Sequence, residues 1–352
     1  MYIISYCGVP NELSFKTKIM ISPFNQKPML RKHKASTFQF RKEEFHVRYH
    51  YFECTQTKEV FTDEELDEIN MNQVYNQYRE KYGIPFPQKI SAIRKKYDIS
   101  APKISEILGL GVNSYRLYEA GEMPSVSNGR LILSIEKPEA FLEQVEASIH
   151  FLSEKEQMKL TSQIQKLQEQ EKSDLWDHLF EEKIFTDHKP SEYNGYRIPD
   201  LEKIAKVISF FSEATETYKT KLNKLLFYTD FLMYKRTAHS MTGISYKAIP
   251  YGPVPAEYDK MYVKLCDDDK INIKPIAFSD GNYGEKIIGR EHATEDFNAI
   301  ELDVLSSVLE LFKSSTTKEV VDISHNEPAW IENEPTRNVI SYQKYAFDLK
   351  AI

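Results

Sequence analysis

The chain has 352 residues, a length typical of two or three domains. Its formal net charge of -7 excludes a uniformly basic nucleic-acid-binding protein and restricts any DNA contact to a local patch. Three scattered cysteines, Cys7, Cys54 and Cys266, make no disulfide framework and fit a reducing cytoplasm. No apolar run reaches the ~20 residues of a membrane span, and no signal-peptide pattern opens the chain. We expect a cytoplasmic, mainly α-helical protein with small β elements, an α+β fold.

Residues 1–62 predict a small β domain. Residues 37–40 and 45–54 alternate apolar and polar side chains, which is the pattern of half-buried strands. The stretches 22–25 and 54–57 lie where a zinc ribbon places its two pairs of cysteines. A structural zinc ion needs four Cys or His ligands, and Cys54 alone among those four positions qualifies. Three histidines lie nearby, His33, His46 and His50, but their spacing is irregular, so we expect no metal in this domain.

A helix-turn-helix DNA-binding domain is predicted over residues 63–150. A capping box at 62–65 opens its first helix. Gly109 and Gly111 make a sharp joint further along, because glycine takes positive φ at little steric cost. The helices around this joint are short and are predicted at residues 90–97, 101–108 and 112–119.

The last of these helices would lie in the DNA major groove as the recognition helix. Its first turn carries Asn113 and Ser114. Asparagine pairs bidentately with adenine, and serine bonds base edges or phosphate. Arg116, Tyr118 and, on the preceding helix, Lys103 complete the predicted DNA contacts. The alternative is a helical hairpin that only packs, but the basic helix before the joint and the polar residues after it favour DNA binding.

Two further helical segments, 125–135 and 137–152, extend this domain, and pairing of two copies through them would engage two half-sites. A charged helical connector is expected at 151–190, because its apolar stripe is narrow and no heptad repeat is sustained. A break in composition at 187–195 marks the last boundary.

The C-terminal domain is predicted over residues 191–352. Residues 220–234 form the most apolar helix of the chain, which we expect to be central and buried. Asp230 within it needs hydrogen-bond partners, and the loop at 246–252 is a candidate source. Two dense motifs follow, Y-G-P-V-P at 251–255 and S-H-N-E-P-A-W at 324–330.

Residues 69–121, with NQVYNQYREKYGIPFP and GVNSYRLYEAG, resemble the C-terminal half of MqsA-type antitoxins, whose DNA-binding domain is of the Cro/repressor class. The β domain before them resembles the zinc-ribbon domain of that family, with Ser22, Asn25 and Thr57 in place of cysteines. The resemblance implies that Asn113 reads a base. The arginine that such antitoxins place four residues later is Leu117 here, next to Arg116.

About residues 193–345 resemble the Panacea domain, an antitoxin domain, through LNKLLFYTDF, G-P-V-P and S-H-x-E-P-A-W. This resemblance implies neutralisation of a partner toxin by direct contact, although some relatives resemble proteolytic adaptors for their toxin. It identifies no toxin-contacting residue. We expect the motif positions to be structural: Asp230, Tyr251, Gly252, Pro253, His325, Glu327 and Trp330.

An enzyme is a competing class, since His325, Glu327, Asp230 and His239 could serve as acid–base residues. The sequence has no nucleophile elbow, phosphate-cradling glycine loop or two-histidine metal helix, so we predict no catalysis and no cofactor. The predicted function is an antitoxin that binds a cognate toxin and, as a homodimer, represses its own operator DNA. The alternative is a transcription regulator whose C-terminal domain senses a ligand or serves as a proteolysis adaptor.

Overall fold

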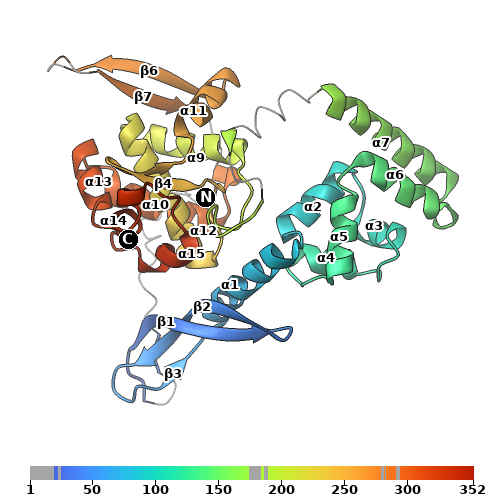
Figure 1. Cartoon of the computed structure of the whole chain (residues 1–352), viewed down its shortest axis with the longest axis horizontal. Helices are drawn as coiled ribbons and strands as arrows, with labels where there is room; N and C mark the ends of the chain where they lie inside the picture. The colour runs from blue at the N-terminus through green and yellow to red at the C-terminus, as the bar shows by residue number, and fades with distance from the viewer. Residues whose placement is uncertain are drawn as a thin grey trace, which may run out of the picture. The chain divides into compact units, whose positions relative to one another are not determined.

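The structure, a computed structural model, describes residues 20–22, 25–173, 184–185, 189–278, 281, 283–290 and 294–352. Helices predominate in this part of the chain, and its strands form small antiparallel sheets, which confirms the predicted α+β class (Figure 1). Cys7 and most of the connector after residue 173 lie outside the described residues. None of the described helices combines the length and apolar character of a bilayer span.

The described residues form two compact units. Unit 1 joins those up to Gln73 with those from 189 onward, and unit 2 comprises those from Val74 to 185. The sequence predicts four domains, each expected to fold on its own. The two compact units do not test that expectation, so the four-domain division stays a prediction.

The N-terminal sheet of unit 1 is a long hairpin with a short third strand. Strand β1 (Met29–Phe40) pairs antiparallel with β2 (Glu43–Cys54), and β3 (Val60–Phe61) pairs with the end of β2. Arg41 and Lys42 form the turn at φ of 49° and 69°, the left-handed region that two-residue hairpin turns require. The predicted strands are confirmed. Strand β1 begins at Met29, earlier than the alternation of side chains indicated. Its mostly polar first half belongs to the sheet through backbone pairing with β2 rather than through burial of its side chains.

Helix α1 (Glu64–Tyr82) closes the open edge of β2 with side-chain amides. Asn70 exchanges two hydrogen bonds with the backbone of His50, at 2.7 and 2.9 Å. Gln73 does the same with the backbone of Arg48, at 2.8 and 2.9 Å. These amides satisfy backbone groups that a neighbouring strand would otherwise pair, so this part of the edge is not free for another chain.

Side chains of the hairpin contact residues near the C-terminal end of the described chain. Arg48 Nη2 lies 3.2 Å from Asp348 Oδ2, and His33 Nε2 lies 3.6 Å from Asp348 Oδ1. The rings of His50 and Phe347 lie 4.5 Å apart. The N-terminal hairpin and the C-terminal elements therefore share one unit although they lie far apart in the sequence.

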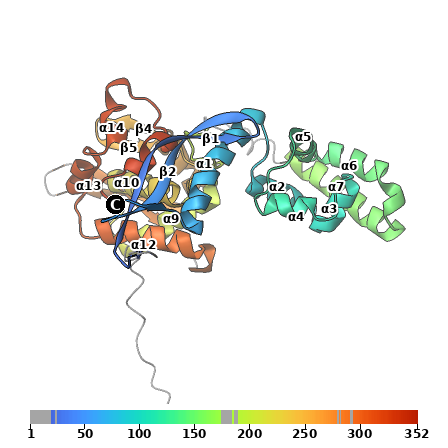
Figure 2. The same ribbon diagram turned by 90° about the horizontal axis from the view of Figure 1, so that it is seen from below.

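Helix α10 (Lys219–Thr237) is the centre of unit 1, with every residue from Lys221 to Tyr234 buried, which confirms the predicted central helix. Figure 2 shows it close to α9 (Leu201–Ala214), α12 (Ala299–Phe312), α13 (Thr317–Ser324) and β5 (Gly252–Pro255), which it contacts. It also contacts β7 (Tyr283–Gly289) and the 3-10 turn Ala346–Asp348. Strand β5 pairs with β4 (Tyr246–Ile249), β7 pairs with β6 (Ile271–Ala277), and the remaining helices are α11 (Tyr258–Asp267), α14 (Pro328–Ile331) and α15 (Tyr342–Tyr345).

Unit 2 is helical. After the end of α1 it contains α2 (Pro87–Lys96), α3 (Ala101–Ile107), α4 (Ser114–Glu119), α5 (Val126–Ser134), α6 (Pro138–Ala147) and α7 (Glu154–Ser173). The core collects isoleucines and three tyrosines, Tyr97, Tyr115 and Tyr118. Leu160 and Ile164 of α7 belong to this core, so the first part of the expected connector packs within unit 2.

Candidate functional site

The carboxylate of Asp230, in the middle of α10, is inaccessible to solvent and fully hydrogen-bonded. It accepts from the backbone N–H groups of Met241 (2.8 Å) and Thr242 (2.7 Å), and from the hydroxyls of Thr242 (2.5 Å) and Tyr246 (2.8 Å). Burial raises the pKa of Asp230, and these bonds oppose the shift because they favour the charged form. Asp230 thus fixes the loop after α10, slightly upstream of the loop that the sequence suggested.

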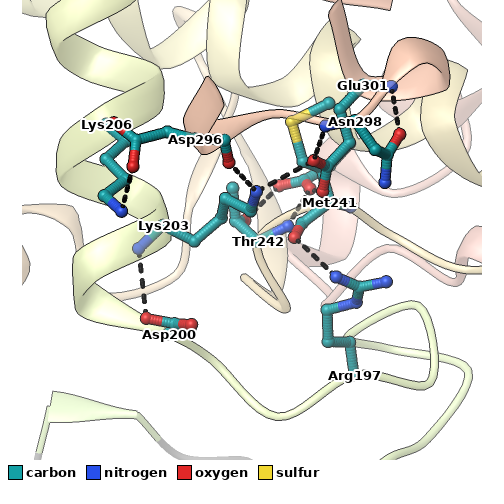
Figure 3. A network of polar contacts seen from close by, with 10 residues as sticks. Arg197, Asp200, Lys203, Lys206, Met241, Thr242, Asp296, Asn298 and Glu301 are labelled. Carbon is teal, nitrogen blue, oxygen red and sulfur yellow. Dashed lines mark hydrogen bonds and ion pairs between the residues drawn. The ribbon is translucent and has the colours of Figure 1, made fainter. Parts of the chain in front are cut away.

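That loop continues into a polar network at the starts of α9 and α12, shown in Figure 3. Arg197 donates to the carbonyl of Met241 at 3.3 Å. Lys203, on α9, reaches the carbonyl of Asp296 at 3.2 Å and the carboxylate of Glu301 at 3.0 Å. Every lysine and carboxylate labelled in Figure 3 has a partner, which is typical of a structural junction between distant segments.

Below the β4–β5 turn lies a lysine that the sequence analysis did not single out. Lys224, on α10, is inaccessible to solvent and donates to the carbonyl of Pro253 at 2.9 Å. Burial lowers the pKa of its ammonium to about 7. Gly252 has a φ of +93°, and a Cβ there would lie 2.4 Å from Ser324 Oγ and 2.6 Å from Lys224 Cε. The G-P-V-P turn therefore needs glycine both for its backbone conformation and for its closeness to α10 and α13.

The two motifs of the C-terminal part form one cluster. Trp330 Nε1 donates to the carbonyl of Ile249 at 2.8 Å, and the His325 ring stacks on Trp330 with centroids 3.9 Å apart. Burial, followed by the charge of Lys224, lowers the pKa of His325, which keeps the imidazole neutral near pH 7. Residues of the S-H-N-E-P-A-W motif thus contact the β4–β5 turn, where the Y-G-P-V-P motif begins.

Glu327 anchors the last residues of the chain. Its buried carboxylate accepts hydrogen bonds from the backbone N–H groups of Lys350 (2.9 Å) and Ala351 (3.0 Å), and from the Tyr228 hydroxyl (3.2 Å). Lys235 completes the clamp by donating to two backbone oxygens, those of Leu349 and Ile352, at 3.1 and 2.9 Å.

Asp230, Glu327 and Trp330 make hydrogen bonds within the fold, Pro253 supplies a carbonyl acceptor, His325 stacks on Trp330, and Gly252 packs closely on α10 and α13; a structural role for these motif positions stays a prediction. Tyr251 differs, because 69% of its surface is exposed. Two residues that matter in this cluster, Lys224 and Lys235, were missed. Lys224 gave a weak signal, because it directly precedes the apolar and aromatic run 225–228, whereas Lys235, followed by Arg236 and Thr237, gave none.

The predicted DNA-reading surface is the exposed side of α4 in unit 2. Gly109 has a φ of +64° and ends the helix before the joint, and Asn113 precedes the first residue of α4. Asn113 and Arg116 are exposed, Ser114 is half-buried, and the Asn113 side chain makes no cap bond to its own helix. These side chains therefore project from unit 2 with their polar groups available.

Inside unit 2, α4 is held firmly. Arg94 of α2 binds Glu119 with two contacts of 2.7 and 3.3 Å, and Tyr115 donates to the carbonyl of Ile90 at 2.9 Å. This pairing leaves Arg94 half-buried.

Two predicted DNA contacts are engaged within the unit. Tyr118 is 8% exposed, and its hydroxyl accepts a hydrogen bond from Asn128 at 3.0 Å. Lys103 pairs with Glu106 at 2.8 Å and with Glu156 at 3.2 Å, and these bonds raise the pKa of its ammonium.

Three of the positions compared with zinc ligands, Asn25, Cys54 and Thr57, lie together. Cys54 is buried, and the Asn25 amide donates to its sulfur at 3.4 Å. Hydrogen bonds from Thr57, from Asn25 and from the Gln56 backbone lower the pKa of the thiol to about 6. Ser22 lies fully buried in the same unit. Across the described residues, no three His, Cys, Asp or Glu side chains are arranged to hold a metal ion.

Comparison with protein families places the C-terminal cluster. A family model described as "Antitoxin SocA-like, Panacea domain" matches residues 222–331, from within α10 to the end of α14. This match supports a Panacea domain in the C-terminal part of the chain and covers no residue of unit 2. The similarity of residues 69–121 to MqsA-type antitoxins stays a prediction. No curated protein matches the chain.

Proposed function

We propose that this protein is the antitoxin of a toxin–antitoxin system, and that its C-terminal part neutralises a cognate toxin by direct contact. The observation that carries this proposal is the match of residues 222–331 to an antitoxin-type domain. A domain that covers the active surface of a toxin inhibits it by steric exclusion, which requires a stable surface and no bond-making chemistry. The packed polar cluster around Asp230 and Glu327 is consistent with such a rigid surface.

We further propose that unit 2 binds operator DNA and represses the operon from the cytoplasm. Asn113, Ser114 and Arg116 are the expected base and phosphate contacts, because the side chains of Asn113, just before α4, and Arg116 are exposed and that of Ser114 is half-exposed. Tyr118 enters this proposal as a residue that positions α4. Lys103 contributes least, because two carboxylates already compensate its charge.

A homodimer is part of the proposal for an energetic reason. Helix α4 has only six residues, so one copy offers few base contacts. Two linked copies that read two half-sites multiply affinity and specificity.

The test is a growth assay with the full chain. The gene adjacent to this chain's gene is expressed from an inducible promoter, alone and together with the full-length protein. We expect growth to stop in the first strain and to continue in the second, and the two proteins to co-elute after purification. If the adjacent product is harmless, or stays toxic in the presence of the full chain, the antitoxin proposal is wrong.

One observation favours the alternative of a ligand-sensing regulator. A cavity of about 630 Å³ lies at the start of α10, lined among others by Tyr218, Lys221 and Glu285. If the full chain binds its own promoter but has no effect on the adjacent gene product, this cavity becomes the place to search for an effector.

A further inference from the structure

A cavity of about 630 Å³ lies where three connections of unit 1 meet. Its lining comes from the loop between α9 and α10, from the loop between α12 and α13, and from residues at the end of β6 and the start of β7. This volume is typical of sites that hold small organic ligands. The contacts of the lining residues indicate which ligand chemistry the cavity suits.

One lining residue is a buried cation without a carboxylate partner. Lys221, in the first turn of α10, is 3% exposed. Its ammonium donates to two neutral oxygens, Thr215 Oγ1 at 3.1 Å and the carbonyl of Ser315 at 2.9 Å. Among the described residues it forms no ion pair, and its third N–H group has no acceptor. Because a buried charge without a counter-charge is costly, this place favours a ligand that brings a negative charge.

The remaining charges of the lining are already compensated. Each of these side chains is in an ion pair with an N–O distance between 2.6 and 2.8 Å: Lys219 with Asp259 and Glu285, Glu216 with Lys286, and Lys313 with Glu310. Glu216 is the carboxylate whose charge acts on Lys221, and it is thus engaged with another lysine. The uncompensated charge of the cavity is therefore positive and belongs to Lys221.

The start of α10 adds backbone donors to the same cavity. A helix leaves its first N–H groups without partners inside the helix, and the positive end of its dipole lies there. Tyr218, the residue before α10, makes no side-chain cap bond. The N–H groups of Thr220 and Lys221 bond no acceptor among the described residues, and both residues line the cavity. Backbone N–H groups at a helix start beside an ammonium are donors that suit a phosphate group.

Aromatic rings form another part of the wall. Tyr218 and Phe278 both line the cavity, with ring centroids 5.5 Å apart. Phe278 is 39% exposed, so part of its ring is accessible to a further contact. Nucleic-acid bases stack on aromatic side chains of this kind. The cavity therefore combines donors for a phosphate with a surface for a planar ring.

We propose that this cavity binds a nucleoside monophosphate, with its phosphate at Lys221 and the start of α10 and its base against the rings of Tyr218 and Phe278. Lys221 already joins the two loops through Thr215 and Ser315, so a ligand bound to it stabilises the folded chain. This site does not depend on the proposed antitoxin function, because it needs no toxin to form.

The experiment titrates the purified full-length chain by calorimetry with AMP, GMP, CMP and UMP in separate runs. Adenosine, which lacks the phosphate, and inorganic phosphate, which lacks the ring, are the partial ligands. We expect at least one nucleotide to bind with a Kd on the order of micromolar and to raise the melting temperature. Its two partial ligands should bind at least about 10-fold more weakly, because each loses one set of contacts. If no nucleotide binds, or if a partial ligand binds as tightly as the best nucleotide, the proposal is wrong.

Two variants and a control locate the site. Thr220→Asp places a carboxylate at the start of α10, where the helix dipole favours it, so the fold is kept while a phosphate is repelled. Asn272→Asp adds the same charge at an exposed position of β6 that does not line the cavity. We expect nucleotide binding at least about 10-fold weaker in Thr220→Asp and in Lys221→Met, and within about 3-fold of the wild type in Asn272→Asp.

The outcomes separate this site from the proposed function. Wild-type affinity in Thr220→Asp, or an equal loss in Asn272→Asp, would overturn the nucleotide site even if Lys221→Met does not fold. Because the titrations contain no toxin, such a result leaves the antitoxin proposal standing. In the same way, a harmless adjacent gene product would remove the antitoxin proposal and leave the nucleotide site in place.

Discussion

The proposed DNA-reading side of unit 2 and the motif cluster of the C-terminal part use polar side chains in opposite ways. Asn113, just before α4, and Arg116, on α4, are exposed and leave their polar groups available. In the motif cluster, the carboxylates of Asp230 and Glu327 accept hydrogen bonds from backbone N–H groups of the same unit. The motif carboxylates of the C-terminal part thus bond within the fold, whereas the polar residues at α4 form an accessible surface. The burial of the side chains, rather than their residue type, distinguishes the two regions.

The strongest way to break this comparison is to remove the buried carboxylate. Asp230→Ala should lower the free energy of unfolding by about 3–5 kcal/mol, because the N–H groups of Met241 and Thr242 and the Tyr246 hydroxyl lose their acceptor in a dry site. Urea titration followed by circular dichroism measures it. Asp267→Ala, at an exposed position of α11, is the control and should change stability by less than about 0.5 kcal/mol. A loss as small as that of the control would show that Asp230 is free for another role.

The second change tests the clamp on the last residues. Glu327→Gln should cost about 2 kcal/mol, because the amide nitrogen faces backbone donors where a carboxylate oxygen accepted them. Amide exchange across residues 345–352 should accelerate, as mass spectrometry can record. Glu310→Gln, which loses only a surface pair with Lys313, should leave that exchange unchanged. Equal protection in both variants would contradict an anchoring role.

A third change sharpens the contrast on the DNA side. Asn113→Ala should weaken specific operator binding by ~1–3 kcal/mol and relax one base preference, with no loss of stability, because the side chain is exposed. Fluorescence anisotropy at fixed salt gives the affinity, and footprinting gives the base. The matched control is Asn326→Ala, an exposed asparagine of unit 1. An unaltered affinity and footprint in Asn113→Ala would remove this residue from the interface.

The smallest effect concerns pH. The pKa of Lys224 is about 7 in the folded chain and near 10.5 when unfolded, so between these values the unfolded state binds more protons and stability rises with pH. Relative to Lys224→Met, the free energy of unfolding of the wild type should rise by about 1 kcal/mol between pH 7 and pH 8. Parallel pH profiles for the two proteins would show that Lys224 stays charged.

Sequence patterns predicted the regular parts of this fold well. The apolar run at 220–234 identified the central helix, and the alternation at 45–54 identified β2, because burial follows period in both cases. The requirement that a buried carboxylate be hydrogen-bonded also held for Asp230. The surroundings of single side chains were harder to predict. Tyr118 lies on the expected recognition helix, yet the structure buries it in the core of unit 2, and its contact with DNA stays a prediction.

Other features could not be read from sequence because they depend on distant pairing. The contact between Asp348 and Arg48 spans almost the whole chain, and nothing local to either residue announces it. The same holds for Lys224, whose partner carbonyl lies on a turn 29 residues away. Tyr251 was grouped with structural positions because its neighbours are, and its exposure alone distinguishes it.

The account rests on two separate binding surfaces, and a double reporter tests that claim most directly. Cells carry the adjacent gene under inducible control and a fluorescent reporter behind the operon's own promoter, and they express either the wild-type chain or the variant Asn113→Ala, Arg116→Ala. We predict that the variant keeps full protection against the induced gene product while the reporter is derepressed. Loss of protection together with repression, or retention of both, would contradict the division of function between unit 2 and the C-terminal part.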